Sequence, residues 1–153
     1  MENRLEVLRA KIDKLIMEKK PEDCRIFFCH LYAVSKFCAL LAIRRNLNPE
    51  LAATSGMLHD IYQLEAGFIE HHAKEGAVEA EIILKELNLY TNEEIKIITT
   101  AISRHSNKKA VHEPYDEVLK DADVMSNFLY NIDYPIIEKE IVRHKNLLIE
   151  LGC

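Results

Sequence analysis

Residues 22–46 read EDCRIFFCHLYAVSKFCALLAIRRN, and this stretch decides the fold class. It contains no Gly or Pro, and its apolar residues recur at the spacing of a helix. The whole chain of 153 residues has 4 Gly and 4 Pro, whereas average usage would give about 18 of the two together. We therefore expect a long, mostly buried helix here, within an all-α protein rather than a turn-rich sandwich.

The rest of the chain continues the helical pattern, and no segment shows sustained period-two alternation. Proline suits the first turn of a helix, so Pro49, Pro114 and Pro135 are each expected to open one. Thr91 and Glu94 have the spacing of a capping box. Six to seven helices are predicted, over residues 3–19, 22–46, 49–61, 70–88, from 91 onward, 114–129 and 135–150.

Composition narrows the class of protein. Hydrophobic residues make up 48% and charged residues 29%, as in a soluble globular protein. The net charge is −5 and no Lys/Arg stripe is visible, so duplex nucleic acid is not an expected partner. The four cysteines form no C-x-x-C motif and are interpreted as buried or reducible thiols. Because the N-terminus is polar and Lys36, Arg44 and Arg45 interrupt the apolar run, we expect no signal peptide, no membrane span and a cytoplasmic protein.

Several polar residues fall on apolar helix faces. His30 lies among Ile26, Phe27 and other apolar neighbours, and His105 and Asp123 follow apolar residues at helical spacing. An unpaired imidazole or carboxylate is costly in a core. A metal ion bound by several such residues would best offset the cost of burying them.

The dipeptide His59-Asp60 ends a short apolar helix and adds one nitrogen and one oxygen donor. Ordered along the chain, the candidates are His30, His59-Asp60, His72, His105 and Asp123, and their separations are those between helices. The H-E-x-x-H, G-x-x-x-x-G-K and G-x-S-x-G motifs are absent, so the mechanisms tied to them have no support.

In this ordered set the chain resembles the HD-domain metal-dependent phosphohydrolases. The matching segments are His30, Met57-Leu58-His59-Asp60-Ile61, His72-Ala-Lys-Glu-Gly76-Ala77, Arg104-His105-Ser106 and Lys120-Asp121-Ala122-Asp123. The resemblance runs from about residue 25 to 130. It implies a single HD-domain-like helical bundle over 1–153, with an N-terminal helix in 1–20, a metal-site core in 21–130 and a C-terminal helix in 135–150.

The resemblance also implies a ligand set. His30, His59, Asp60 and Asp123 match the basic metal ligands of the family, with Asp121 as the rival of Asp123. His72 and His105 match the two further histidines of members that bind two metals. One or two divalent ions are therefore expected, from among Mn, Fe, Mg, Co, Ni and Zn.

The expected activity is hydrolysis of a phosphomonoester or phosphodiester, with a nucleotide as the first candidate, by hydroxide on the metal. Asp60 and His71 are the expected catalytic residues, and His71 would donate a proton to the leaving group. Gln63, Arg104, Lys108 and Lys109 are the expected phosphate contacts.

Gln63 departs from the family, since many members carry Lys or Glu at that position. The alternative function is accordingly a catalytically weak sensor or interaction module that binds metal and nucleotide. A homodimer is also possible, because the apolar residues from Leu5 to Ile16 could pack either against the rest of the bundle or against a second copy of the chain.

Overall fold

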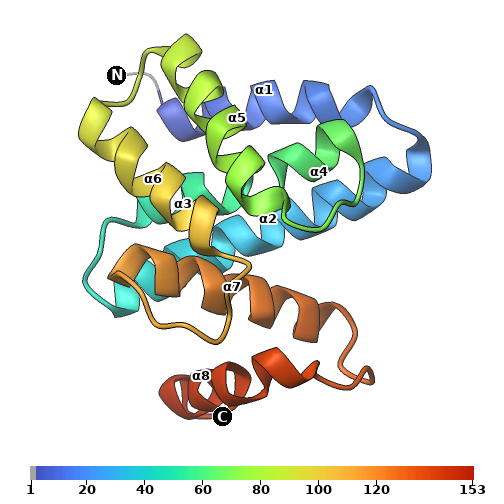
Figure 1. Ribbon diagram of the computed structural model, residues 1–153, viewed down its shortest axis with the longest axis vertical. Coiled ribbons are helices and arrows are strands. Elements are labelled where there is room, and N and C mark those ends of the chain that lie inside the picture. The colour runs from blue at the N-terminus through green and yellow to red at the C-terminus, as the bar shows by residue number, and fades with distance from the viewer. Residues whose placement is uncertain (1–2) are drawn as a thin grey trace.

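The computed structural model describes residues 3–153 and is all-α over that range, as the sequence predicts (Figure 1). Residues 1 and 2, the start of the predicted 1–20 segment, lie outside the described residues. The elements are α1 (Arg4–Met17), α2 (Pro21–Arg44), α3 (Pro49–Leu58), α4 (Ile61–Ala66), α5 (His72–Leu87), α6 (Asn92–Arg104), α7 (Pro114–Tyr130), the 3-10 turn η1 (Glu138–Glu140) and α8 (Ile141–Leu151).

Helices α2 and α3 form the centre of the bundle. Every residue of α3 from Leu51 to Leu58 is buried. The two helices approach closely at Gly56, where a Cβ atom would lie 2.7 Å from the Cα atom of Ser35. The Ser35 hydroxyl donates to the carbonyl of Ala53 at 2.9 Å. This contact fixes the end of α3, and with it the position of the His59-Asp60 pair.

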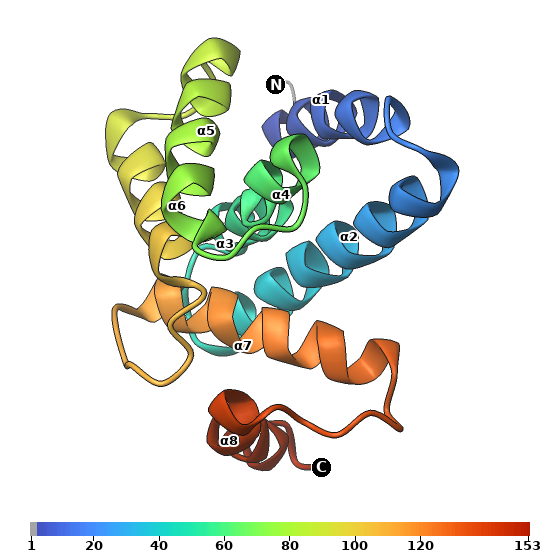
Figure 2. The same ribbon diagram turned by 45° about the vertical axis from the view of Figure 1, so that its right-hand side comes forward.

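The remaining helices surround this centre. Helix α7 packs against α2, α3 and α6, while α5 pairs with α6 and α4. In Figures 1 and 2, α8 lies on the side of α7 that faces away from the other helices. Helices α2, α5, α6 and α7 thus each present one face or one end to a common centre.

Helix α2 is the one described helix that is long and apolar enough to cross a membrane, by length and composition alone and despite Lys36 and Arg44. Core helices of globular proteins pass the same test. In the bundle α2 buries Leu31, Val34 and Cys38 and packs against α1, α3 and α7. A single helix of this kind is weak support for a membrane span.

Two predicted helices differ from the observed ones by more than two residues at one end, and α4 was not predicted. The helix predicted over 49–61 ends at Leu58, because the backbone turns at Asp60 (φ −109°, ψ 21°) before α4 begins. Pro135 opens no helix, so the predicted C-terminal helix is wrong at its start. The Asn131 side chain accepts from the amide of Asp133, and the amide of Tyr134 donates to the Asn131 carbonyl, which closes a turn. The chain then continues through η1, and α8 begins only at Ile141.

Candidate metal centre

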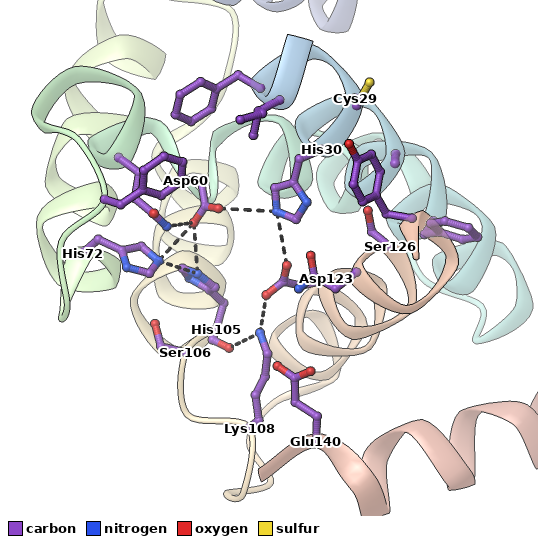
Figure 3. Close-up of a pocket in the computed structure, with 18 of the residues that line it drawn as sticks. Cys29, His30, Asp60, His72, His105, Ser106, Lys108, Asp123, Ser126 and Glu140 are labelled. Atoms are coloured by element: carbon purple, nitrogen blue, oxygen red, sulfur yellow. Dashed lines mark hydrogen bonds and ion pairs between the residues drawn. The ribbon is translucent and has the colours of Figure 1, made fainter. Parts of the chain in front are cut away.

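The fold brings the six predicted ligands together from five parts of the chain, and all of them except His59 are labelled in Figure 3. They come from α2, the α3–α4 junction, the start of α5, the end of α6 and the middle of α7. Figure 3 shows the carboxylate of Asp60 between His30 on one side and His72 and His105 on the other. The ligands are His30, His59, Asp60, His72, His105 and Asp123.

One donor set surrounds a point between α2, α3 and α7. The Nε2 atom of His30 lies 3.4 Å from Oδ2 of Asp60 and 3.3 Å from Oδ1 of Asp123. The Nε2 atom of His59 lies 3.3 and 3.7 Å from the same two oxygens. Donors at metal–ligand distances of about 2.1 Å lie roughly 3.0–3.4 Å from one another in octahedral and tetrahedral shells. Three of the four distances fall in this range, and the distance from His59 to Asp123 lies just above it, so the set is close to the dimensions of a coordination shell.

A second donor set uses the other oxygen of Asp60. Its Oδ1 atom lies 3.0 Å from Nε2 of His72 and 3.5 Å from Nε2 of His105. Because the two oxygens of Asp60 face different histidine pairs, Asp60 is the one residue shared by both sets. His30, His59, Asp60 and Asp123 would hold one divalent ion, and Asp60, His72 and His105 would hold a second.

The imidazole tautomers test whether this arrangement fits a metal. The Nδ1 atoms of His59, His72 and His105 lie 2.8, 3.1 and 2.7 Å from the carbonyls of Gly56, Ile69 and Ile102. A carbonyl only accepts, so each Nδ1 carries a proton and each ring turns its Nε2 toward the cluster, the atom that would bind a metal in its deprotonated form. Backbone carbonyls commonly orient metal-binding histidines in this way. The donor set therefore fits a divalent metal.

The electrostatics keep both carboxylates ionised. Burial opposes the charged form of Asp60, yet His59 and other histidines of the cluster hold its pKa well below the usual range. Burial likewise opposes ionisation of Asp123, but Lys108 and the histidines lower the pKa. Burial disfavours protonated His59, although Asp60 and Asp123 raise its pKa to about 10. Burial lowers the pKa of His105. Two fixed negative charges inside the bundle therefore attract a cation.

Two of the predicted phosphate contacts instead support the ligands. The buried ammonium of Lys108 donates to Oδ2 of Asp123 at 2.5 Å and to the carbonyl of His105 at 2.7 Å. The Gln63 amide donates to Oδ1 of Asp60 at 2.9 Å. Both side chains also line the cavity above the cluster. They hold the carboxylates in place and remain within reach of a ligand.

The structure separates the two candidates for the last aspartate. Asp123 faces His30 and His59. Asp121 accepts from Arg45 at 2.6 Å and from Arg143 at 2.8 Å, on the opposite side of α7. Both of its oxygens are occupied by guanidinium groups, so Asp121 belongs to a structural ion-pair network that ties α7 to α2 and α8.

Three predicted site residues are not brought to the cavity. His71 is exposed and caps α5 in the left-handed conformation (φ 65°). Arg104 is turned away from neighbouring His105 and pairs with buried Asp116 at 2.8 Å. Lys109 is exposed, although its neighbour Lys108 is buried. Sequence proximity to a ligand did not place these side chains. Arg104 and His105 follow each other at the end of α6, where successive residues point about 100° apart, whereas Lys109 lies in the loop after α6 and His71 lies before the first turn of α5.

A cavity of about 700 Å³ opens over the cluster. It is lined by residues that the sequence analysis did not single out, from the α4–α5 loop, the end of α7 and η1. No motif contains these residues. The turn before η1, which the sequence did not predict, brings Lys139 and Glu140 to the cavity. The Ser106 hydroxyl, also on the lining, is buried and has no hydrogen-bond partner in the described chain. The additional residues that matter below are Phe68, Ser106, Tyr130, Lys139 and Glu140.

The fold and the cluster together define a protein that is all-helical over the described residues and has a His/Asp cluster that could hold a metal. The model of the HD domain family matches residues 27–127, which include every ligand of both donor sets. The chain belongs to the HD domain family. Proteins with HD domains bind divalent metals and are generally metal-dependent hydrolases. Comparison with curated proteins and with solved structures finds no match.

Proposed function

We propose that the protein is a metal-dependent phosphohydrolase that acts on a phosphomonoester or phosphodiester, with nucleotides as the first candidates. The observation that carries the proposal is the pair of donor sets sharing Asp60 at the floor of the cavity. His30, His59, Asp60 and Asp123 would hold one divalent ion, and Asp60, His72 and His105 a second. Such ions, when bound, supply Lewis acidity and lower the pKa of coordinated water.

The chain's own residues prepare the site for an anionic substrate. Lys108 is neutralised by Asp123, whereas Lys139 lines the cavity without an ion-pair partner among the described residues. Lys139 is therefore the cation we assign to the substrate phosphate, in place of Arg104 and Lys109. The unpartnered hydroxyl of Ser106 supplies a further hydrogen bond to a phosphate oxygen.

Glu140 replaces His71 as the proposed proton donor to the leaving group. It lines the cavity and is 8% exposed. Burial raises the pKa of its carboxyl, although Lys108 opposes the shift. A carboxyl that stays protonated closer to neutral pH serves better as a general acid.

A catalytically weak sensor is the second candidate, and Gln63 favours it. Its amide has no ionisable proton and already donates to Asp60. A protein that binds metal and nucleotide through the same cavity without turnover would need no acid or base at this position.

The decisive experiment is turnover by the purified protein, stripped of metal with a chelator and reloaded with Mn, Fe, Co, Ni, Zn or Mg. The panel comprises nucleoside monophosphates, cyclic nucleotides, dinucleoside polyphosphates and p-nitrophenyl phosphate. We expect activity with at least one metal and a loss of about 10³-fold or more in Asp60→Asn. Asp133→Asn, an exposed aspartate outside the cavity, is the matched control.

Full activity of Asp60→Asn would exclude this site as the catalytic centre. A reloaded protein that binds a nucleotide tightly, yet leaves it intact on prolonged incubation, would support the sensor instead.

A further inference from the structure

One face of α2 carries both a metal ligand and an apolar wall. Ile26, His30, Ala33 and Phe37 follow one another at intervals of four, three and four residues, and all line the cavity. The sequence suggested that apolar core surrounds His30. The structure shows instead that this apolar face borders an open cavity, because Ile26 is 45% exposed.

The wall continues in a pair of stacked rings. The centroids of Phe27 and Phe68 lie 5.9 Å apart, and the rings are within 6° of parallel. Phe27 is buried, whereas Phe68 is 70% exposed. One face of the Phe68 ring is therefore covered by Phe27, and the rest of the ring is open. Phe27 lies one helical turn before His30, so the stack begins next to the proposed metal centre.

Two more exposed apolar side chains complete the rim. Leu129 and Tyr130, at the end of α7, line the same cavity and are 49% and 67% exposed. Scattered apolar residues on a surface are ordinary. Their concentration around a concave site with polar groups at its floor is typical of ligand binding.

The part of the cavity lining that comes from α2 and from the α4–α5 loop has no charged side chain apart from the imidazole of His30. The polar lining residues Ser126, Asn127 and Lys139 come from α7 and η1. The α2 and Phe68 side of the cavity therefore suits a flat apolar group better than the hydroxyls of a bare sugar.

We propose that the substrate carries an aromatic ring that stacks on the open face of Phe68 while its phosphate occupies the metal centre. The inference rests on the proposed function and narrows it to phosphate esters with an aromatic organic part. A nucleobase and a simple aryl group share this chemistry. Sugar phosphates without a base fall outside it.

Binding of phosphonates to the metal-loaded protein tests the proposal without turnover, since their C–P bond is not hydrolysed. Calorimetry would compare methylphosphonate, 2-phenylethylphosphonate and 2-cyclohexylethylphosphonate. We expect the phenyl compound to bind about tenfold more tightly than the methyl compound. The cyclohexyl compound, which has similar apolar area but no flat face, should gain clearly less.

Variants of Phe68 separate stacking from simple burial. Phe68→Leu, which keeps apolar bulk, should reduce the phenyl-to-methyl affinity ratio to about threefold or less, and Phe68→Trp should keep it. Val78→Ala, an exposed apolar residue of α5 outside the cavity, is the control and should leave the ratio unchanged. The 5′-phosphonates of adenosine and of ribose, compared in the same way, distinguish a nucleobase from a simple aryl group as the source of the ring.

Equal affinity for the methyl and phenyl compounds, or an unchanged ratio in Phe68→Leu, would overturn the inference and leave the phosphohydrolase proposal intact. If the loaded protein binds none of these phosphonates and hydrolyses no ester, the proposed function fails and the inference fails with it.

Discussion

The Nε2 atoms of His72 and His105 lie 3.1 Å apart, and the Nδ1 atom of each ring faces a backbone carbonyl. Both rings therefore hold their ring proton on the far side, and burial lowers the pKa of His105. Two lone pairs at this distance repel each other unless a cation lies between them. The pair thus requires either an additional proton or a metal ion, and Asp60 faces the same point.

Metal content distinguishes these two possibilities. We expect two divalent ions per chain in the protein, one in His72→Ala and none in Asp60→Asn, since Asp60 serves both donor sets. Elemental analysis after dialysis gives these values directly. His71→Ala is the matched control, because His71 is adjacent in sequence but exposed. One ion per chain in both the unmodified protein and His72→Ala would mean that the histidine pair holds a proton and not a second ion.

The two aspartates of the Lys120-Asp121-Ala122-Asp123 segment should respond differently to removal of their charge. Asp123→Asn is expected to lose the ion shared with His30 and His59. Asp121→Asn should keep its metal but lose about 1–3 kcal/mol of unfolding free energy, because Arg45 and Arg143 lose a buried partner. Metal analysis and urea unfolding of both variants provide the comparison. Loss of metal in Asp121→Asn alone would reverse the assignment.

The fold class could be predicted from the sequence because it depends on local periodicity: apolar spacing places the helices, and it also places His30, His105 and Asp123 on apolar helix faces. The full ligand set was implied by the resemblance to the HD-domain family. The exception is Pro135, which was predicted to open a helix. The side chain and carbonyl of Asn131 instead close a turn just before the proline.

The outer part of the site could not be predicted, because it depends on tertiary placement. Arg104 and Lys109 are close to His105 in sequence, yet neither lines the cavity. Phe68 and Lys139 come from a loop and a 3-10 turn with no motif, and only the folded chain brings them to the rim. The apolar face of α2 around His30 could not be recognised as a cavity wall, because its sequence pattern is the same as that of a buried core face.

Lys108 is expected to matter most when the metal is absent. Its ammonium is almost fully buried and neutralises Asp123. Lys108→Met leaves that carboxylate without its partner and should cost about 3–5 kcal/mol of unfolding free energy in the metal-free protein. The loss should be smaller after metal is restored, since a bound cation also neutralises Asp123. Urea unfolding with and without metal measures both values, and the exposed Lys109→Met is the control. Equal losses in the two states would contradict this role.

Lys139 is expected to act on substrate binding. Lys139→Ala removes the cation that lines the cavity without an ion-pair partner, so KM for the best substrate should rise about five- to tenfold with little change in kcat. Lys139→Arg should restore most of the affinity. Steady-state kinetics give both constants, with Lys145→Ala, an exposed lysine of α8 outside the cavity, as control. A fall in kcat at unchanged KM would show that the residue does not act by binding the ground-state phosphate.

The acid stability of the fold should depend on Arg4, which joins α1 to the starts of α3 and α6. Its guanidinium donates to both oxygens of Glu94, at 2.9 and 2.7 Å, and to Glu50. The Arg4 hydrogen bonds, with further help from the Thr91 amide, lower the pKa of Glu94 from 4.5 to about 2. A lowered folded-state pKa means that the stabilisation is fully present above pH 4.5 and is lost as the pH falls toward 2.

Glu94→Gln should therefore cost about 1 kcal/mol at neutral pH and less as the pH falls, so that the two proteins converge near pH 2. The substitution keeps the capping-box geometry, since an amide oxygen can still accept from the Thr91 amide. Urea unfolding at several pH values between 2 and 7 measures the convergence, with the exposed neighbour Glu93→Gln as control. A constant difference across this range would show that Glu94 stabilises the fold through packing and capping and not through its charge.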